Sequence, residues 1–230
     1  MDNGDFMHPF YKEFIEHLQK ADKEWCVDKA MSMLSTGDID IATLYNEILT
    51  PSLNGDEFDP VDEGLRVWKE HERTAIVRTV IENCYPYVIK ERRKRVGASI
   101  GEKVVIFCPT EELHEMGARM VADFFTLCGY EVSFIGANTP LGDILVGIGS
   151  VRPGYVALSV TNHYNLVAAG KAIERIVRLR KDLGLEFKII VGGRAFERHK
   201  ELVYQMGADM YLSSLDDISK LAGGRAHAGA

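Results

Sequence analysis

Apolar residues in the first part of the chain recur at helical spacing, in segments separated by short polar or glycine-containing connections. The pattern predicts helices over residues 9–21, 23–34, 39–49 and 60–85. Gly37 is expected to close the second helix. Pro60 suits the first position of the fourth, which we expect to end before Pro86. Residues 5–93 contain no strand-like run bounded by turn signals, so this part is predicted to be a small helical bundle.

The pattern changes at Lys103, where short and almost continuously apolar runs rich in β-branched residues begin. These runs predict strands at residues 103–108, 131–136, 155–160, 187–193 and 209–214. The stretches between them, such as 113–127 and 164–183, are long enough for helices. Strands alternating with helices predict an α/β fold with a parallel sheet covered on both faces. Five repeats fit a flavodoxin-like (Rossmann-like) domain with a five-stranded parallel sheet.

The change of pattern predicts two domains joined by a short connection. We assign residues 1–93 to the helical bundle, 94–102 to a linker and 103–230 to the α/β domain. The junction carries the basic sequence RRKRVGASIGE, residues 92–102. Such a cluster could bind phosphate, but a solvated linker is the simpler interpretation.

Composition and charge agree with a globular protein and exclude some functions. Of the 230 residues, 46% are apolar and 27% are charged, and the net charge of −7 argues against a surface devoted to nucleic acid. The four cysteines show no CxxC or zinc spacing, which favours reduced, buried thiols. No apolar run has the length of a membrane span, and the N-terminal sequence MDNGDFMHPF is acidic. We therefore expect a soluble, cytoplasmic protein.

The loops that follow the predicted strands are the expected place for chemistry, because open α/β sheets bind ligands at the carboxyl ends of their strands. These loops are residues 109–117, 159–165, 192–196 and 213–217. They lack the GxGxxG of dinucleotide binders, a P-loop, and the aspartate and lysine of a phosphoacceptor receiver. They also show no Ser–His or Cys–His pair, so the pattern does not favour an enzyme that acts alone.

One histidine in the first loop, His114, has the surroundings of a metal ligand. A neutral imidazole binds transition metals, and Glu112, two residues away, can accept the other ring N–H and fix the tautomer. A lone histidine does not suit zinc, which takes three or four protein ligands. The plainer alternative is a surface histidine near a helix start, with Glu111, Glu112 and Glu115 placed favourably for the helix dipole.

Small residues in the same set of loops predict a narrow slot. Gly117 would allow a bulky planar ligand or the backbone to come close, and Gly192–Gly193 carries no side chains. Together with the small hydroxyls of Ser159 and Thr161, this glycine pair would leave room between strands. A slot beside a single histidine suits a large metal-bearing cofactor with a tail.

These positions resemble the motifs of the cobalamin-binding domain family. That family carries D-x-H-x-x-G after the first strand, S-x-L after the third and GG after the fourth. The corresponding residues here are Glu112-x-His114-x-x-Gly117, Ser159-x-Thr161 and Gly192-Gly193. Glutamate replaces the aspartate of the first motif, and threonine replaces the leucine of the second. The resemblance covers the chain from about Ile39 onward, including the helical bundle upstream of the domain.

The resemblance implies that cobalamin, a cobalt corrinoid, is the cofactor and that it binds in the base-off, His-on form. His114 would be the lower axial ligand of cobalt, with Glu112 hydrogen-bonded to it. The residues implied to line the slot for the nucleotide tail are Ser159, Thr161, Gly192 and Gly193. The helical bundle would cap the upper face of the corrin ring.

The Glu-x-His form of the first motif is more similar to light-sensing, adenosylcobalamin-dependent repressors than to methyl-carrying corrinoid proteins, which usually keep aspartate. The helical bundle of those repressors carries a tryptophan and, ten residues later, Glu-His, which Glu70-His71 match. Pro60 stands in place of that tryptophan, and Val61 stands where those repressors have an upper-face histidine. A DNA-binding module is also not found, so we expect no direct DNA binding. The two missing residues leave light-triggered release of an adenosyl group an open question.

His71 lies on an apolar face of the last predicted helix of the bundle. The residues of this face are Val61, Leu65, Trp68, His71 and Ala75. An inward-facing histidine there is either a hydrogen-bonded core residue or a group over the cofactor, and the resemblance favours the upper face of the corrin. Trp68 and Phe58 are available as an aromatic lid, with core packing as the alternative.

Two functions follow from the resemblance. The first is a non-catalytic cobalamin sensor or regulatory module that acts through a protein partner. The second is a corrinoid carrier subunit of a methyltransferase system, in which cobalt does the chemistry and the protein supplies ligation and capping. Either function is compatible with a homo-oligomer, and the sequence leaves the upper axial ligand and the identity of the partner open.

Overall fold

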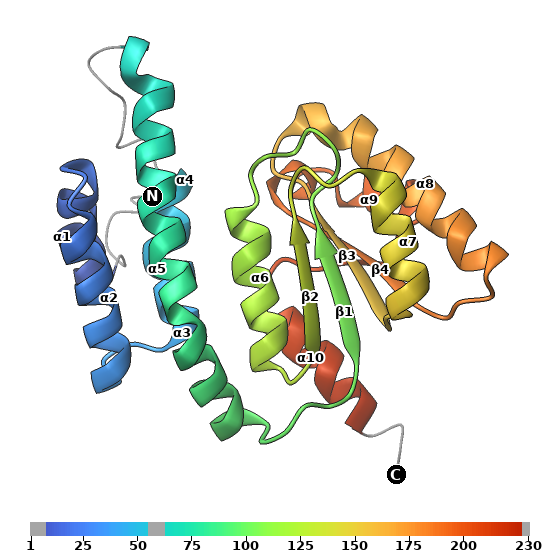
Figure 1. Ribbon diagram of the computed structural model, residues 1–230, viewed down its shortest axis with the longest axis horizontal. Coiled ribbons are helices and arrows are strands. Elements are labelled where there is room, and N and C mark those ends of the chain that lie inside the picture. Colours follow the sequence, from blue (N-terminus) through green and yellow to red (C-terminus); the bar gives the residue numbers. More distant parts are fainter. Residues whose placement is uncertain (1–7, 55–62, 227–230) are drawn as a thin grey trace. The chain divides into compact units, whose positions relative to one another are not determined.

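The computed structural model describes residues 8–54 and 63–226, and the chain divides into two compact units, residues 1–91 and residues 92–230. The first unit is helical and the second contains a five-stranded sheet (Figure 1). The predicted fold class, a helical region followed by a flavodoxin-like parallel sheet, is confirmed. Phe58, Pro60 and Val61 lie outside the described residues.

The helical unit follows the sequence signals closely. Its elements are α1 (Pro9–Gln19), α2 (Lys23–Thr36), α3 (Ile41–Thr43), a π-helical segment (Leu44–Leu49), α4 (Thr50–Asn54), a 3-10 turn (Glu63–Leu65) and α5 (Arg66–Arg95). The side chain of Asp22 accepts a hydrogen bond from the backbone N of Trp25 and so caps α2. Gly37 ends α2 with φ +82°, as expected for a glycine in the left-handed conformation.

Helix α5 does not end before Pro86, as the sequence suggested, but continues to Arg95. Proline in a helix interior removes one backbone hydrogen bond and crowds the preceding turn. Val88, two residues beyond Pro86, is fully buried, and the burial of apolar surface favours continuing the helix. Basic residues 92–95 form its last turn, where positive charge suits the helix dipole. Residues 94 and 95 of the predicted linker are therefore helical.

The alternative that His71 is a hydrogen-bonded core residue of the helical unit is wrong, and its assignment to the upper face of the corrin stays a prediction. Its side chain is exposed, as are those of Trp68 (68%) and Leu65 (47%), so none of the three is a core residue. The buried side of α5 carries Ile76, Val77, Val80, Ile81, Cys84 and Val88. His71 and Val80 are nine residues apart, and at about 3.6 residues per turn they point to opposite sides of the helix.

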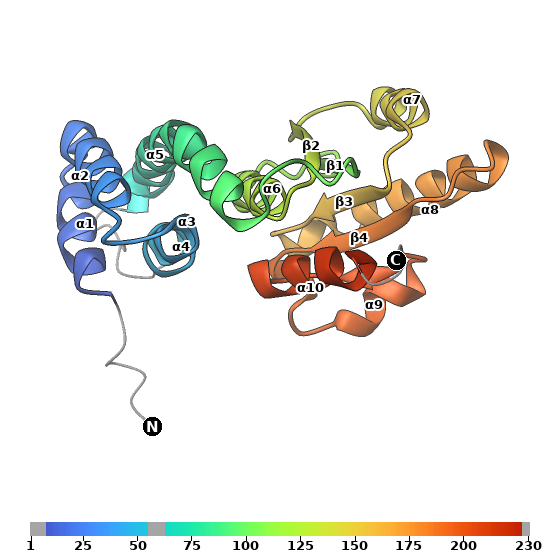
Figure 2. The same cartoon turned by 90° about the horizontal axis from the view of Figure 1, so that it is seen from below.

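All five strands of the α/β unit are parallel, in the order β2-β1-β3-β4-β5. The strands are β1 (Lys103–Phe107), β2 (Glu131–Gly136), β3 (Tyr155–Ser159), β4 (Lys188–Gly192) and β5 (Met210–Tyr211). The helices are α6 (Met116–Leu127), α7 (Leu141–Val151), α8 (Leu166–Asp182), α9 (Lys200–Gln205) and α10 (Leu215–Ala226). Seen along the strands, α6 and α10 lie on one side of the sheet and α7 and α8 on the other (Figure 2).

The central strands β1, β3 and β4 are buried on both faces, as their continuous apolar character predicts, whereas the edge strand β2 is only partly buried and its Ile135 is 42% exposed. Alternate strand side chains pack against α7, α8 and α9 in one core cluster, which includes Val105, Phe107, Val156, Leu158, Ile189 and Val191. The strand order reverses between β1 and β3, because the chain crosses from β1 to one edge and from β3 to the other. Sheets of this kind bind ligands at the carboxyl ends of the strands at that reversal.

The four cysteines are free and buried, as the sequence predicts. Burial raises the pKa of the Cys26 and Cys108 thiols to about 12, so both stay protonated and weakly nucleophilic at neutral pH. None of the helices in the described ranges is both long and apolar enough to cross a membrane.

Gly193, which follows β4, is expected to tolerate alanine poorly. Its φ is +99°, and a Cβ there would lie 2.3 Å from the backbone oxygen of Val160. We expect Gly193→Ala to lower the free energy of unfolding by about 2–4 kcal/mol in urea denaturation. Gly142→Ala in α7 is the control, because a Cβ there meets no described atom within 4 Å. A Gly193→Ala variant as stable as this control would contradict the close backbone approach.

Candidate functional site

The loop after β1 begins with a tight turn that aims the side chains behind it. The backbone N of Glu112 donates a hydrogen bond to the oxygen of Pro109 at 3.0 Å, and Glu111, at the third position of the turn, has φ +75°. A positive φ is unfavourable for glutamate and is retained only where the surrounding structure holds it. The turn sends the side chain of Glu112 into the protein and leaves Glu111 and Leu113 exposed.

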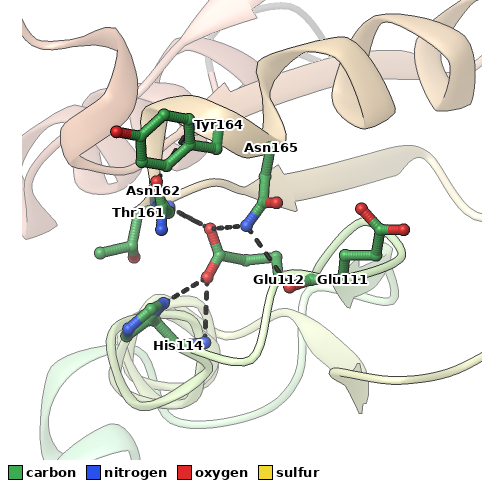
Figure 3. A network of polar contacts seen from close by, with 7 residues as sticks. All are labelled: Glu111, Glu112, His114, Thr161, Asn162, Tyr164 and Asn165. Carbon is green, nitrogen blue, oxygen red and sulfur yellow. Dashed lines mark hydrogen bonds and ion pairs between the residues drawn. The ribbon is translucent and has the colours of Figure 1, made fainter.

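The carboxylate of Glu112 is fully buried and accepts five hydrogen bonds (Figure 3). Its Oε1 accepts from the backbone N of His114 at 3.0 Å and is 2.6 Å from the ring Nδ1 of the same residue. Its Oε2 accepts from the backbone N atoms of Thr161 (2.9 Å) and Asn162 (2.8 Å) and from the side-chain amide of Asn165 (3.1 Å). Glu112 therefore joins the loop after β1 to the loop after β3.

These hydrogen bonds keep the buried carboxylate ionised. Burial by itself would raise the pKa of Glu112, but the bonds from the Asn162 backbone, the Asn165 amide and both donors of His114 hold that pKa below its ordinary value. An ionised carboxylate only accepts hydrogen bonds, so the hydrogen between Glu112 and His114 belongs to Nδ1. In the neutral imidazole, the second ring nitrogen, Nε2, then carries the free lone pair.

The side chain of His114 is 51% exposed, in contrast to the fully buried carboxylate that holds it. One ring nitrogen faces Glu112 and the other points away from the network (Figure 3). A histidine with its tautomer fixed by a carboxylate and its Nε2 exposed is the arrangement found in metal-ligating histidines. Across the described residues, no three His, Cys, Asp or Glu side chains gather to hold a metal ion. A metal at His114 would therefore bring its remaining ligands with it.

Asn165 belongs to this network, and no sequence motif indicates its role. The helix predicted from Tyr164 begins at Leu166, and a 3-10 turn over residues 163–165 precedes it. The side chain of Asn162 caps that turn by accepting a hydrogen bond from the backbone N of Tyr164. Asparagine is a common cap, so the cap at Asn162 was open to prediction. The bond from Asn165 to Glu112 joins residues 53 apart, and only the tertiary fold brings them together.

The other residues predicted after β3 and β4 lie side by side but act mainly through the backbone. Ser159 and Gly192 are partners in the β3–β4 register, and Thr161 contributes its backbone N–H to Glu112. A Cβ at Gly192 would lie 2.7 Å from the backbone oxygen of Leu212, and Gly193 has a comparable requirement. The glycine pair thus allows neighbouring backbones to approach closely. This role differs from the predicted one, in which the absent side chains leave a slot for the cofactor tail.

Gly117, at the second position of α6, has no such requirement. A Cβ built there meets no atom of the described residues within 4 Å, so the packing of the chain does not demand glycine. The absent side chain instead leaves room for an external group, in keeping with a planar ligand near His114. Trp68, Glu70 and His71 lie on α5 in the helical unit, and their side chains are exposed.

Exposed apolar side chains stand on both loops that meet at Glu112. Leu113 is 67% exposed on the first loop, and Tyr164 and Val167 are 91% and 69% exposed at the second. The donor set and its surroundings therefore fit a broad apolar group that carries its own metal.

Comparison with known protein families agrees with this chemistry. Residues 102–214 match the B12 binding domain family, a range that contains β1 to β5 and the whole Glu112 network.

Two relatives with assigned names share the region. The chain is 25% identical over 154 residues to the HTH-type transcriptional repressor CarA of Myxococcus xanthus, covering 67% of this chain and 49% of the repressor. It is 26% identical over 130 residues to trimethylamine corrinoid protein 1 of Methanosarcina acetivorans, covering 56% and 57% of the two chains. The chain thus spans about half the length of these relatives.

Among solved structures, the monomethylamine corrinoid protein of Methanosarcina barkeri matches with a TM-score of 0.70 over 92% of this chain and 96% of that one. Its identity of 13% makes this a likeness of fold. The family match and the corrinoid relative agree on one cofactor. The chain therefore contains a B12 binding domain of the cobalamin-binding family over residues 102–214, and its cofactor is cobalamin.

Proposed function

We propose that this chain binds cobalamin in the base-off, His-on form and acts as a sensor or regulatory module through a protein partner. The observation that carries the ligand assignment is the 2.6 Å contact between His114 Nδ1 and the buried Glu112 carboxylate. That contact fixes the ring so that the exposed Nε2 is the lower axial ligand of cobalt. When bound, the cofactor supplies a cobalt centre that can carry an alkyl group, and the protein supplies ligation and orientation.

The remaining cofactor contacts are proposed on both sides of the corrin ring. We assign the nucleotide tail to the edge of the sheet formed by Ser159, Thr161 and the glycine pair at 192–193. The register between Ser159 and Gly192 supports this assignment, because it places small residues next to each other at the carboxyl ends of β3 and β4. We assign the upper face to Trp68, Glu70 and His71, whose exposed side chains are not used in the core of the helical unit.

A regulatory role is favoured by the sequence relationship to a repressor. The 154 residues matched by CarA exceed the 139 residues of the α/β unit, residues 92–230, so that similarity reaches beyond the α/β unit. The Glu-x-His form of the first motif agrees with this branch. The second candidate is a corrinoid methyl carrier, which is supported by the match to a trimethylamine corrinoid protein.

The ligand assignment predicts that His114→Ala loses the His-on absorption and electron paramagnetic resonance signatures of bound cobalamin. The fold should be unchanged, because the side chain is half exposed and lies on a loop. His163→Ala is the matched control, since His163 is exposed on the facing loop and is proposed to leave the cobalt coordination as it is. Nitrogen coupling to cobalt that persists in His114→Ala would refute the assignment.

The ionised state of Glu112 predicts a pH-dependent contribution to stability. Its pKa in the folded protein is below the ordinary 4.5, so the contribution is complete above about pH 4.5 and is lost as pH falls toward the folded pKa. We expect Glu112→Gln to lower the free energy of unfolding by about 2–4 kcal/mol near neutral pH, because a neutral amide cannot match five donors.

The difference between wild type and Glu112→Gln should shrink in acid, as measured by urea denaturation over a pH series. Glu111→Gln, at an exposed neighbour, should show no such trend. A difference that stays constant down to strongly acidic pH would mean that the carboxylate is not ionised in the folded protein.

The two candidate functions predict different responses to the upper ligand. Purified protein would be mixed in the dark with adenosyl-, methyl- or hydroxocobalamin, freed of excess cofactor and then illuminated. A sensor is expected to retain one alkyl form selectively and to change its size in chromatography when the cobalt–carbon bond breaks. Comparable retention of methyl- and hydroxocobalamin without a change in size would favour the carrier, and no retained corrin would refute both.

A further inference from the structure

Glu115 follows His114 directly and makes a long-range contact of its own. It occupies the N-cap position of α6, but its side chain makes no capping hydrogen bond there. Its Oε2 instead accepts a hydrogen bond from the backbone N of Ala137, 22 residues away, at 2.7 Å. Ala137 is the first residue after β2, so this carboxylate ties the His114 loop to the neighbouring strand on the side opposite β3.

The end of β2 is shaped around this carboxylate. Gly136 has φ +74°, which favours glycine, and a Cβ there would lie 2.5 Å from Glu115 Oε2, so any other residue would also displace this carboxylate. The register between β1 and β2 shifts at this point, with Phe107 opposite Gly136 instead of Ile135. The oxygen of Gly136 also accepts from the backbone N of Cys108 at 2.9 Å, which locks the irregular end in place.

His114 therefore stands between two carboxylates that fasten its loop in opposite directions. Glu112 holds the loop to the segment after β3, and Glu115 holds it to the segment after β2. The backbone continues into α6 at Glu115, whose oxygen accepts from the backbone N of Arg119 at 2.9 Å. Glu112 and Glu115, which lie on either side of His114 along the chain, are thus both fixed relative to the sheet.

We propose that Glu115 is a positioning residue for His114, which acts by reaching the backbone N–H of Ala137 and so holding the imidazole where it can ligate cobalt. The inference rests on the proposed function. A purely structural role for Glu115, through its charge near the start of α6, is the alternative. The two roles differ in what they require, because positioning needs the length of the side chain and helix stabilisation needs its charge.

Two conservative variants separate length from charge. Glu115→Gln keeps the length and an oxygen that can accept from Ala137 but removes the charge. Glu115→Asp keeps the charge, which suits a helix start, but is one methylene too short to reach Ala137 from the same backbone position. Positioning predicts that the glutamine variant stays close to wild type and that the aspartate variant behaves like Glu115→Ala.

The readout is the ratio of His-on to His-off forms in protein reduced to Co(II) cobalamin, from nitrogen coupling in electron paramagnetic resonance spectra. We expect Glu115→Asp and Glu115→Ala to lower this ratio about tenfold, the lower end of the loss seen when an outer partner of a metal ligand is removed. Glu111→Gln serves as the control on the same loop. Loss of the ratio in Glu115→Gln with retention in Glu115→Asp would overturn the positioning role.

A cofactor-free measurement separates this inference from the proposed function. Nitrogen-15 spectra of the His114 ring in the apo protein should show one well-defined tautomer in wild type and Glu115→Gln, and an averaged ring in Glu115→Asp and Glu115→Ala. Identical ring spectra in all four proteins would overturn the positioning role even where cobalt ligation by His114 is established. Absence of nitrogen coupling in the wild type, with ring spectra that follow the pattern above, would instead overturn the cobalt ligation alone.

Discussion

The buried carboxylate of Glu112 is the interaction on which the candidate site depends. A charge removed from water is strongly unfavourable unless hydrogen bonds replace its hydration. Here the replacement comes from five donors on two loops 49 to 53 residues apart in sequence. Those loops meet because β1 and β3 are neighbours in the sheet. The orientation of His114 is therefore a property of the strand order, as much as of the residues beside it.

The sequence was sufficient for the elements whose signals are local. Each strand is a continuous apolar run, so β1 to β4 were located to within a residue or two, and the turn residue Gly37 marked the end of α2. The errors occurred on α5, where tertiary packing overrides local preference. Val88 is buried beyond Pro86, so the helix continues past the proline. Leu65 and Trp68, in the first part of the segment, do not lie on the face of α5 that is buried from Ile76 onward. Periodicity finds an apolar face but does not tell which partner covers it.

The site divides in the same way. Glu112 and His114 are two residues apart, and the sequence predicts their interaction because a carboxylate and an imidazole at that spacing can form a hydrogen bond. The sequence does not indicate the long-range hydrogen bonds of the site, because each depends on loops that only the sheet brings together. These are the bonds to Glu112 from the Asn165 side chain and from the backbone N–H groups of Thr161 and Asn162, and the bond to Glu115 from Ala137. The glycine pair at 192–193 also has a second role that the sequence pattern did not indicate, because close backbone approach requires it, while the slot for the cofactor tail stays a prediction.

Glutamate in place of aspartate at position 112 determines which groups the carboxylate can reach. The two oxygens of Glu112 divide the work: Oε1 serves His114, and Oε2 serves the segment that leads into α8. The extra methylene lets Oε2 reach that segment while Oε1 stays within hydrogen-bonding distance of the His114 imidazole. In the proposed function, one carboxylate therefore influences both the cobalt–histidine bond, through Oε1, and the hydrogen bonds from the segment before α8, through Oε2. In that proposal, charge drawn toward one oxygen weakens the hydrogen bonds that the other accepts, so ligation of cobalt by His114 would be linked to the loop after β3 through this carboxylate alone.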